Sequence, residues 1–553
     1  MSGNNIEQLN SLINDYFEKE DKQSPTSASA LGIHKYDHEL EDFSEDNQKK
    51  MKNSLNEHYR ALKKIDFEDL DTDNRIKYHL LNERIKSSYQ FFEETRNLQV
   101  DPALYAEVAI NSVFLLTLRN YAPLEDRLKA AASRMKKLPA FFDTAKKNLE
   151  NPPRIFTTVA SEMLQGAGAF FKGLIPKMAE ETPSIKNDIL LASDVALAAV
   201  RDYQKFIVED LSRRSDGDFA IGKKLMDKML TETEFLNYDS DQLWKKGEEE
   251  LEKCEQEVEK FVKKNFDAHK PWREVYKEVK KNHPAADKVL QTYVEYLEKA
   301  RKFVEKHDIV EIPANQKLVA MDTPEFNRSL TPFAAMMPPA PYEEDQTSYL
   351  WVTPVDPSQS AQNQERQLRD SSYGKIQYVS LHEAYPGHHL QLVYSNRIKD
   401  PMFCRTFSNI FIEGWAFYCE QLMKELGYFD KEGELCQLEA AYWRALRILL
   451  DVGLHTRRFD FDGAMEFLQS KVDWSPFIAE GELKRYTRTP TQALSYYTGK
   501  LELFNIKRGY EKQKKDSFSL RQFHEDLLNC GSLPPKLIEW KLGLKEVEKP
   551  KLR

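Results

Sequence analysis

The residues best suited to chemistry lie in one short run, from Leu381 to Gln391. Three of the chain's 12 histidines, His382, His388 and His389, fall in this run, and a glutamate follows the first of them. Neutral imidazoles bind zinc, and a neighbouring carboxylate can take a proton from water that the metal activates. The spacing is wider than the His-Glu-x-x-His of a single zinc-binding helix. The run therefore predicts a metal centre built on a helix that is not regular.

Pro386 stands four residues after His382, where a regular helix would place the second ligand. Proline has no N–H to bond the His382 carbonyl, and it disfavours helical geometry at Tyr385. At ~100° per residue, an unbroken helix would align His389, not His388, with His382. We expect a kink or wide turn that brings His388 to the metal, but geometry alone leaves His388 and His389 open.

A second motif, Phe411 to Tyr418, supplies a candidate third ligand, Glu413. Two histidines and one glutamate leave one coordination position open, as a catalytic zinc requires. The sequence thus predicts one zinc ion held by His382, His388 and Glu413, with Glu383 as general base. Glu420 shares a helical face with Glu413, and we expect it to face solvent rather than to support a ligand.

Composition restricts the class of protein. The chain has 553 residues and a net charge of -9, so it lacks the basic excess that nucleic acid as a main partner would need. Its start is polar and acidic, without a signal-type apolar stretch, and no apolar run approaches the ~20 residues of a membrane span. The five cysteines are scattered and odd in number, as reduced thiols are. We expect a cytoplasmic monomer or homodimer with no membrane and no nucleic-acid partner.

Apolar residues recur at three- and four-residue spacing over most of the chain, which predicts helices. The pattern changes near Asp308. Strand-like runs at 309–312, 317–321 and 349–353 flank a proline-rich stretch at 331–341. We therefore expect a small antiparallel sheet within residues 306–355. We divide the chain into an N-terminal helical lobe, 1–305, and a catalytic region, 306–553, which together form one family domain.

The two motifs together resemble the bacterial "domain of unknown function 885" family, which is similar to the glutamate-zincin metallopeptidases. Softer matches cover nearly the whole chain: Leu31–His34, Asp451–His455, Pro490–Tyr496 and Gly531–Pro534. The resemblance implies a mainly α, two-lobed helical clamshell of the oligopeptidase and carboxypeptidase type, with the small sheet beside its cleft. It also implies zinc-dependent peptide hydrolysis, and it favours His388 as the second ligand.

The resemblance suggests supporting residues as well. Relatives stabilise the oxyanion of the reaction with a tyrosine or histidine near the C-terminus, and the candidates are Tyr496, Tyr497 and His455. Both tyrosines have the alternative of being core aromatics. Asp451 and His455 share a helix face, either as a second layer around the metal or as a plain surface pair.

Substrate termini also need partners. Three cations near Tyr496 could hold a C-terminal carboxylate, or be ordinary surface charges: Arg485, Arg488 and Lys500. His389 either packs in the core or binds substrate.

The predicted function is zinc-dependent hydrolysis of short peptides, with carboxypeptidase, dipeptidase and oligopeptidase action all open. One alternative keeps the metal and changes the substrate to a non-peptide amide metabolite, cleaved by hydrolysis or elimination. The other is a non-catalytic scaffold. That reading predicts a missing ligand or base, whereas His382, Glu383, His388 and Glu413 are all present.

Overall fold

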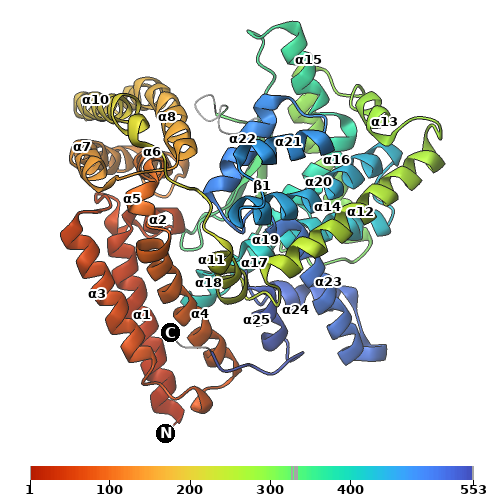
Figure 1. Ribbon diagram of the computed structural model, residues 1–553, viewed down its shortest axis with the longest axis horizontal. Coiled ribbons are helices and arrows are strands. Elements are labelled where there is room, and N and C mark those ends of the chain that lie inside the picture. The colour runs from red at the N-terminus through yellow and green to blue at the C-terminus, as the bar shows by residue number, and fades with distance from the viewer. Residues whose placement is uncertain (1, 325–327, 329–333, 551–553) are drawn as a thin grey trace. The chain divides into compact units, whose positions relative to one another are not determined.

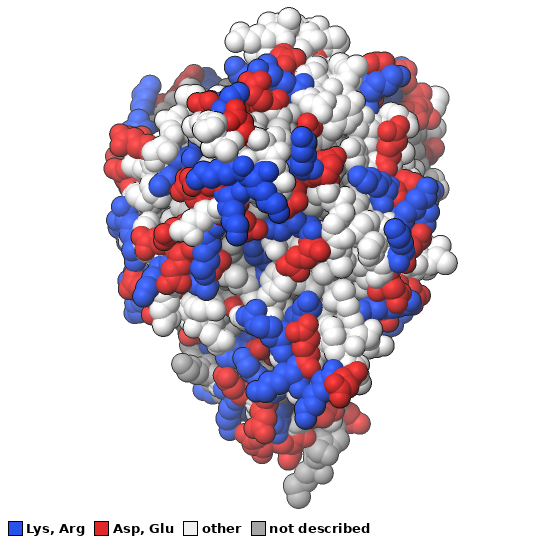
Figure 2. All heavy atoms as spheres, turned by 90° about the vertical axis from the view of Figure 1, so that its right-hand side faces the viewer, with Lys and Arg blue, Asp and Glu red and all other residues white. Residues whose placement is uncertain are grey.

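The structure is a computed structural model that describes residues 2–324, 328 and 334–550. Helices dominate it, as Figure 1 shows, and one small sheet accompanies them, so the expected mainly α fold is confirmed. On the face drawn in Figure 2, basic and acidic side chains are interspersed over the described residues, as the composition predicts. No single described helix is long and apolar enough to cross a membrane; Thr72–Val100 and Pro102–Leu118 pass that test only as a pair, bent by 89°.

The chain forms two compact units. The first comprises Met1–Ile221, Ala340–Asp345 and Val547–Arg553, and the second comprises Gly222–Pro339 and Gln346–Glu546. We expected a boundary at 305/306, where the sequence pattern changes. That change marks the start of the sheet and not the edge of a unit, because α12 (Ser240–Asn265) packs along α20 (Lys431–His455) within the second unit.

Helices make up the regular elements of the first unit in its described residues, joined by turns and irregular segments. Its inner helix is α6, whose tyrosine, alanine, valine and leucine side chains are buried between α7 and α8. Asp101 caps α6 by accepting the N–H groups of Ala103 and Leu104, and Pro102 occupies the first turn. The helices are α1 (Ser2–Gln23), α2 (Pro25–Leu31), α3 (Glu45–Leu62), α4 (Thr72–Tyr89), α5 (Asn97–Val100), α6 (Pro102–Leu118), α7 (Leu124–Asn148), α8 (Arg154–Ala169), α9 (Ile175–Glu180) and α10 (Lys186–Glu209).

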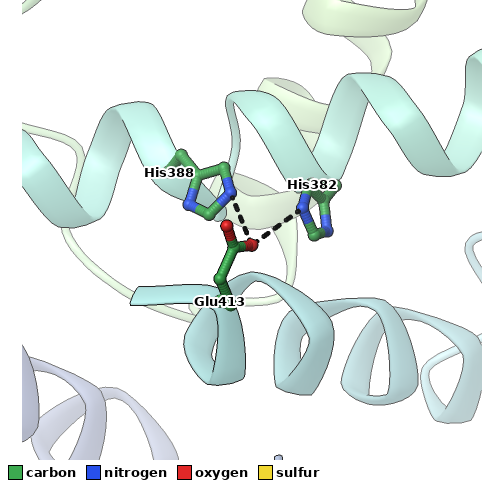
Figure 3. A group of neighbouring side chains, drawn as sticks. All are labelled: His382, His388 and Glu413. Carbon is green, nitrogen blue, oxygen red and sulfur yellow. Dashed lines mark ion pairs between the residues drawn. The ribbon is translucent and has the colours of Figure 1, made fainter. Parts of the chain in front are cut away.

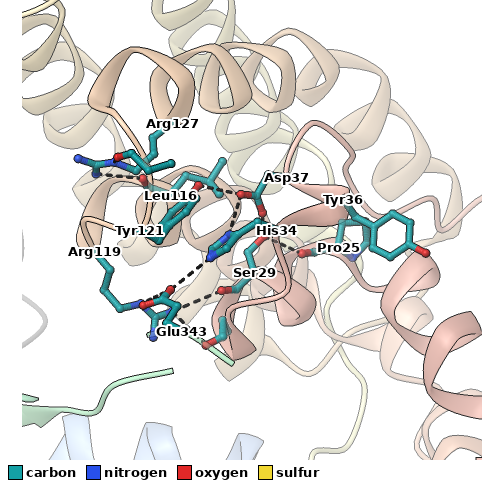
Figure 4. A network of polar contacts seen from close by, with 12 residues as sticks. Pro25, Ser29, His34, Tyr36, Asp37, Leu116, Arg119, Tyr121, Arg127 and Glu343 are labelled. Atoms are coloured by element: carbon teal, nitrogen blue, oxygen red, sulfur yellow. Dashed lines mark hydrogen bonds and ion pairs between the residues drawn. The ribbon is translucent and has the colours of Figure 1, made fainter. Parts of the chain in front are cut away.

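A polar network at His34 fixes the segment 340–345 in the first unit (Figure 4). The His34 ring stacks on the Tyr121 ring, with 3.5 Å between the ring centroids. Asp37 pairs with His34 and accepts a hydrogen bond from the Tyr121 hydroxyl. Glu343 pairs with His34 at 3.4 Å and with Arg119 at 3.2 Å. The Leu31–His34 motif therefore has a structural use, which is to hold a returning segment of the chain.

The second unit carries the remaining helices and the sheet. Its closest helix pair is α19 and α23. The helices are α11 (Lys223–Lys228), α12 (Ser240–Asn265), α13 (Trp272–Val279), α14 (Val289–Lys306), α15 (Ala361–Arg369), α16 (Tyr373–Glu383), α17 (His388–Asn396), α18 (Pro401–Cys404), α19 (Asn409–Glu425), α20 (Lys431–His455), α21 (Phe461–Lys471), α22 (Pro476–Arg488), α23 (Ser495–Lys514), α24 (Leu520–Leu528) and α25 (Pro535–Lys541).

The sheet has three strands, β1 (Lys317–Asp322), β2 (Ala334–Met337) and β3 (Thr347–Val352), in the order β1-β3-β2. It is mixed and not purely antiparallel as expected: β1 runs parallel to β3, and β2 antiparallel. β2 lies in the proline-rich stretch, of which residues 331–333 are outside the described residues. The expected strand at 309–312 is absent, because this apolar segment packs as irregular chain after α14.

His524, in α24, makes folding depend on pH. Its ring is fully buried; Nδ1 donates to the Ile309 carbonyl at 2.7 Å, and Nε2 accepts from the Tyr418 hydroxyl at 2.9 Å. Burial lowers the pKa of His524 from 6.5 to about 4. Between these values the unfolded chain binds a proton that the folded chain does not, so stability falls as pH drops from 6.5 towards 4.

We expect this loss to reach about 3 kcal/mol for His524. Urea unfolding at pH 7 and at pH 4.5 measures it, with His524→Gln as the comparison. Other buried groups act on both proteins alike, so the variant should lose less stability on acidification than the parent. Equal losses would show that His524 is not neutral in the folded protein.

Candidate metal centre

The chain breaks between the first two predicted ligands. His382 lies in the last turn of α16 and His388 begins α17, so the interruption expected at Pro386 is present. The turn is tight at Gly387, where a Cβ atom would lie 1.9 Å from the His382 carbonyl oxygen. The Trp415 indole donates to the Pro386 carbonyl at 2.8 Å and so fixes the turn from α19. His388 is thereby brought beside His382, with 4.7 Å between the ring centroids.

Glu413 reaches the two histidines from α19 (Figure 3). Its Oε2 lies 3.4 Å from His388 Nε2 and 3.8 Å from His382 Nε2. One ligand atom from each residue lies within 4.8 Å of the others. Zinc ligands at about 2.0–2.2 Å from a shared ion are separated by distances of this order. Glu413 Oε2 is also buried with no hydrogen-bond partner, so these three residues fit a single cation.

Glu420 supports the first ligand. It is fully buried, and its Oε1 lies 2.8 Å from His382 Nδ1 and 2.9 Å from Arg444 of α20. With Nδ1 donating to the carboxylate, His382 presents the lone pair of Nε2 to a metal. The expectation that Glu420 faces solvent is therefore wrong. The face it shares with Glu413 is buried, because α16 packs against α19 there and Arg444 of α20 reaches Glu420.

Glu383 ends α16 directly after the first ligand and is half-buried. The Met336 N–H of β2 donates to its carboxylate, so the sheet orients this side chain. Burial raises the pKa of Glu383 to about 7. A carboxyl group with that pKa exchanges protons readily near neutrality, as a general base must.

Tyr496 is the downstream candidate that lies at the metal centre. Its ring stands 6.4 Å from the His382 ring, centroid to centroid, and its side chain lies close enough to Glu413 to help lower the pKa of that carboxyl group. The helix that carries it, α23, crosses α19 very closely, since a Cβ on Gly499 would lie 1.9 Å from the Ile410 carbonyl oxygen. Two glycines, Gly414 and Gly499, thus set the approach that places Tyr496.

The neighbouring candidates on α23 point elsewhere. Tyr497 donates to Glu250 at 3.1 Å and lies 3.3 Å from the Cys254 sulfur. Lys500 lies over the Tyr497 ring and, with these residues, lines a separate cavity of about 420 Å³. Neither residue belongs to the His382–His388–Glu413 cluster.

Asp451 and His455 are both fully buried and lie 3.9 Å apart. Asp451 accepts the N–H groups of Thr491 and Leu494, and His455 bonds the Tyr486 carbonyl. Asp451 therefore fixes the turn that leads into Tyr496, and the pair is not a surface pair.

Three further candidates have other surroundings. His389 is buried and bonds Ser348 of β3 and Gln316, which makes it a link between α17 and the sheet. Arg485 pairs with Glu482, and Arg488 ends α22. Sequence reasoning missed Arg444, Arg447 and Glu482. For the two arginines, their charge between the apolar residues of α20 could have indicated them; Glu482 lies in the charged helix α22, where it has no such signal.

Comparisons with known proteins identify the protein family to which this chain belongs. The chain matches the family model described as "Bacterial protein of unknown function (DUF885)" over residues 25–542, and it belongs to that family. No curated protein matches it. It is similar to a solved structure from Shewanella oneidensis, with 27% identity, a TM-score of 0.80, and 97% of this chain and 99% of that chain covered. A structure from Colwellia psychrerythraea shares the fold at 17% identity and a TM-score of 0.83, with 98% of each chain covered.

Both of these proteins are described as a "putative lipoprotein", the first as one "of unknown function". Lipoproteins are anchored to membranes or secreted, so this finding contradicts the cytoplasmic location expected from the sequence. That expectation rests only on the polar start of the chain and on its unpaired thiols.

Proposed function

We propose that this protein is a zinc-dependent peptidase that hydrolyses short peptides. The observation that carries the proposal is the joint position of His382, His388 and Glu413, with Glu383 beside them. Two imidazoles and one carboxylate form the ligand set of a catalytic zinc site with an open position.

Bound at these residues, zinc would lower the pKa of a water ligand and polarise a carbonyl oxygen. The protein's own groups do the remaining work. Glu383 takes a proton from the attacking water and returns it to the leaving amine. The Tyr496 hydroxyl, on a ring that lies 6.4 Å from the His382 ring, donates to the oxyanion of the tetrahedral intermediate.

Burial and hydrogen bonds arrange the charges for this task. Burial lowers the pKa of His382 well below its usual value, which keeps the ring neutral as a ligand must be. Burial alone would raise the pKa of Glu413, but the neighbouring His388, His382 and Tyr496 side chains lower it to about 2. The third ligand is therefore ionised at any pH at which the protein is expected to work.

Metal removal tests the proposal. We expect about one zinc ion per purified chain, hydrolysis of a mixture of two- to ten-residue peptides, and loss of that hydrolysis on treatment with a chelator. Added zinc should restore it. The His388→Ala variant should lose the metal, while His389→Gln, changed at the adjacent position, should keep it.

Two results would contradict the proposal in different ways. A zinc-loaded protein that cleaves no peptide but opens N-acyl metabolites would assign the same centre to non-peptide amides. If the purified protein binds no zinc, and His388→Ala matches it in stability and in peptide hydrolysis, a non-catalytic role for the fold is left.

A further inference from the structure

Two arginines beside the metal centre share one carboxylate. Arg447 of α20 lies 3.4 Å from Glu482 Oε2, and Arg485 of α22 lies 2.9 Å from the same atom. The Tyr486 hydroxyl donates to that atom as well, at 2.5 Å. One oxygen of Glu482 thus serves two guanidinium groups, and this cluster keeps one positive charge in excess.

The part of this charge on Arg447 is poorly solvated, whereas the Arg485 side chain is 37% exposed. The Arg447 side chain is only 11% exposed, and its guanidinium lies between two rings, 4.8 Å from Trp443 and 4.6 Å from Tyr496. Contacts with aromatic faces stabilise such a cation only in part. A buried charge is costly unless an opposite charge pairs with it. The arrangement therefore favours an anionic ligand at Arg447.

The neighbouring acidic groups are already committed. Glu420 pairs with Arg444 and with His382, so it completes a pair of its own. Glu413 belongs to the metal ligands and is separated from Arg447 by the Tyr496 side chain. Among the described residues, Glu482 is the carboxylate with which both Arg447 and Arg485 form ion pairs.

The position of this charge matters for substrate. The Tyr496 ring has Arg447 against its face and lies 6.4 Å from the ring of His382, centroid to centroid. An anion held by Arg447 would thus lie one tyrosine side chain away from the reacting carbonyl. A planar guanidinium binds a carboxylate through two parallel N–H donors, which an ammonium group cannot do.

We propose that Arg447, supported by Arg485 and Glu482, binds the C-terminal carboxylate of the substrate, which makes the protein an exopeptidase that acts at free C-termini. The inference rests on the proposed peptidase function. It moves the carboxylate site from the residues expected by sequence, Arg488 and Lys500, to an arginine that sequence reasoning missed. Of the three expected cations, Arg485 remains, as the partner that shares Glu482.

Paired substrates test it directly. We expect the parent to hydrolyse a tripeptide with a free C-terminus at least ~10-fold better, in kcat/KM, than the same tripeptide amide. Arg447→Lys keeps the positive charge but loses the two parallel N–H donors, and Arg447→Met loses both. The preference for the free C-terminus over the amide should therefore be smaller in Arg447→Lys than in the parent, and smallest in Arg447→Met, mainly through a higher KM. Arg273→Lys is the matched control. Arg273 lies in α13, and it too stacks on a tryptophan, Trp272, and pairs with a glutamate, Glu255.

A binding readout separates this inference from the proposed function. N-acetyl-phenylalanine and its amide are titrated into the Glu383→Gln protein by calorimetry, and the acid alone should bind. Adding Arg447→Met should weaken that binding ~10-fold or more. Equal binding of acid and amide, or acid binding that survives Arg447→Met, would overturn the inference. If the acid binds through Arg447 but no peptide is cleaved, the carboxylate site stands and the peptidase function fails.

Discussion

Replacing Glu383 with glutamine is expected to lower kcat for peptide hydrolysis by about 10²–10⁴-fold while zinc content stays unchanged. Glutamine has the same shape and can still accept the Met336 N–H, so the turn and the metal ligands should keep their places. It cannot take a proton. The loss therefore isolates proton transfer from binding, and KM should change little.

The measurement is kcat at saturating peptide, together with zinc determination on the same preparation. Glu425→Gln, at the exposed end of α19, makes the same chemical change on the helix that carries Glu413 and should leave kcat alone. A Glu383→Gln protein with full zinc and more than a tenth of the parent's kcat would show that another group moves the proton.

The same substitution also distinguishes peptide hydrolysis from a scaffold role. A scaffold gains nothing from a carboxyl group whose pKa burial raises to about 7, since burial of that kind costs stability. Retaining Glu383 in a half-buried position is expected where its proton is used. Glu383→Gln should accordingly be at least as stable as the parent in urea.

Sequence predicted which three residues come together at the candidate metal centre, because their chemistry is carried by residue type and by local spacing. The break at Pro386 follows from a missing N–H, and that local fact is enough to expect two helices where one would otherwise run. The position that His388 takes after the break depends on contacts with other parts of the chain. His388 comes beside His382 and Glu413 because Gly387 passes close to the His382 carbonyl and Trp415 holds Pro386 from another helix.

Sequence could not choose between Tyr496 and Tyr497. Consecutive residues on a helix point ~100° apart, so only one of them can face the metal. Which one does depends on the rotation of α23 against α19, which Gly414 and Gly499 fix by close contact. The same rotation sends Lys500 into a cavity with Cys254 and Glu250. Packing between distant segments, which no single-helix pattern records, decided these outcomes.

The pairing of the strands and the division into units differ from the expectation for a related reason. Apolar runs at 309–312 and 317–321 look alike in sequence, yet only the second has a partner strand, β3, at hand. Strand pairing is a long-range property, and β2 pairs although prolines flank it. The helices near residue 250 join the second unit because the apolar face of α12 meets α20, which lies about 200 positions further along the chain.

Glu420 was expected to face solvent, but the structure buries it fully beside His382 and Arg444. Its replacement is therefore expected to have a large effect. Glu420→Gln is expected to lower the free energy of unfolding at pH 8 by about 3–5 kcal/mol, because it leaves the Arg444 charge buried without its partner. It should also weaken zinc binding ~10- to 100-fold, since a neutral amide orients His382 less firmly than a carboxylate. Denaturant unfolding of the metal-free protein and zinc titration measure the two effects separately.

A double variant separates the charge from the hydrogen bond. Arg444→Met removes the cation, so adding it to Glu420→Gln should recover much of the lost stability and little of the zinc affinity. The reason is that the unpaired charge disappears, while His382 Nδ1 still faces an amide oxygen and not a carboxylate. If Glu420→Gln alone is as stable as the parent at pH 8, then Glu420 is protonated in the folded protein despite Arg444 at 2.9 Å. The neutral carboxyl group would then act on the metal centre only through its hydrogen bond to His382.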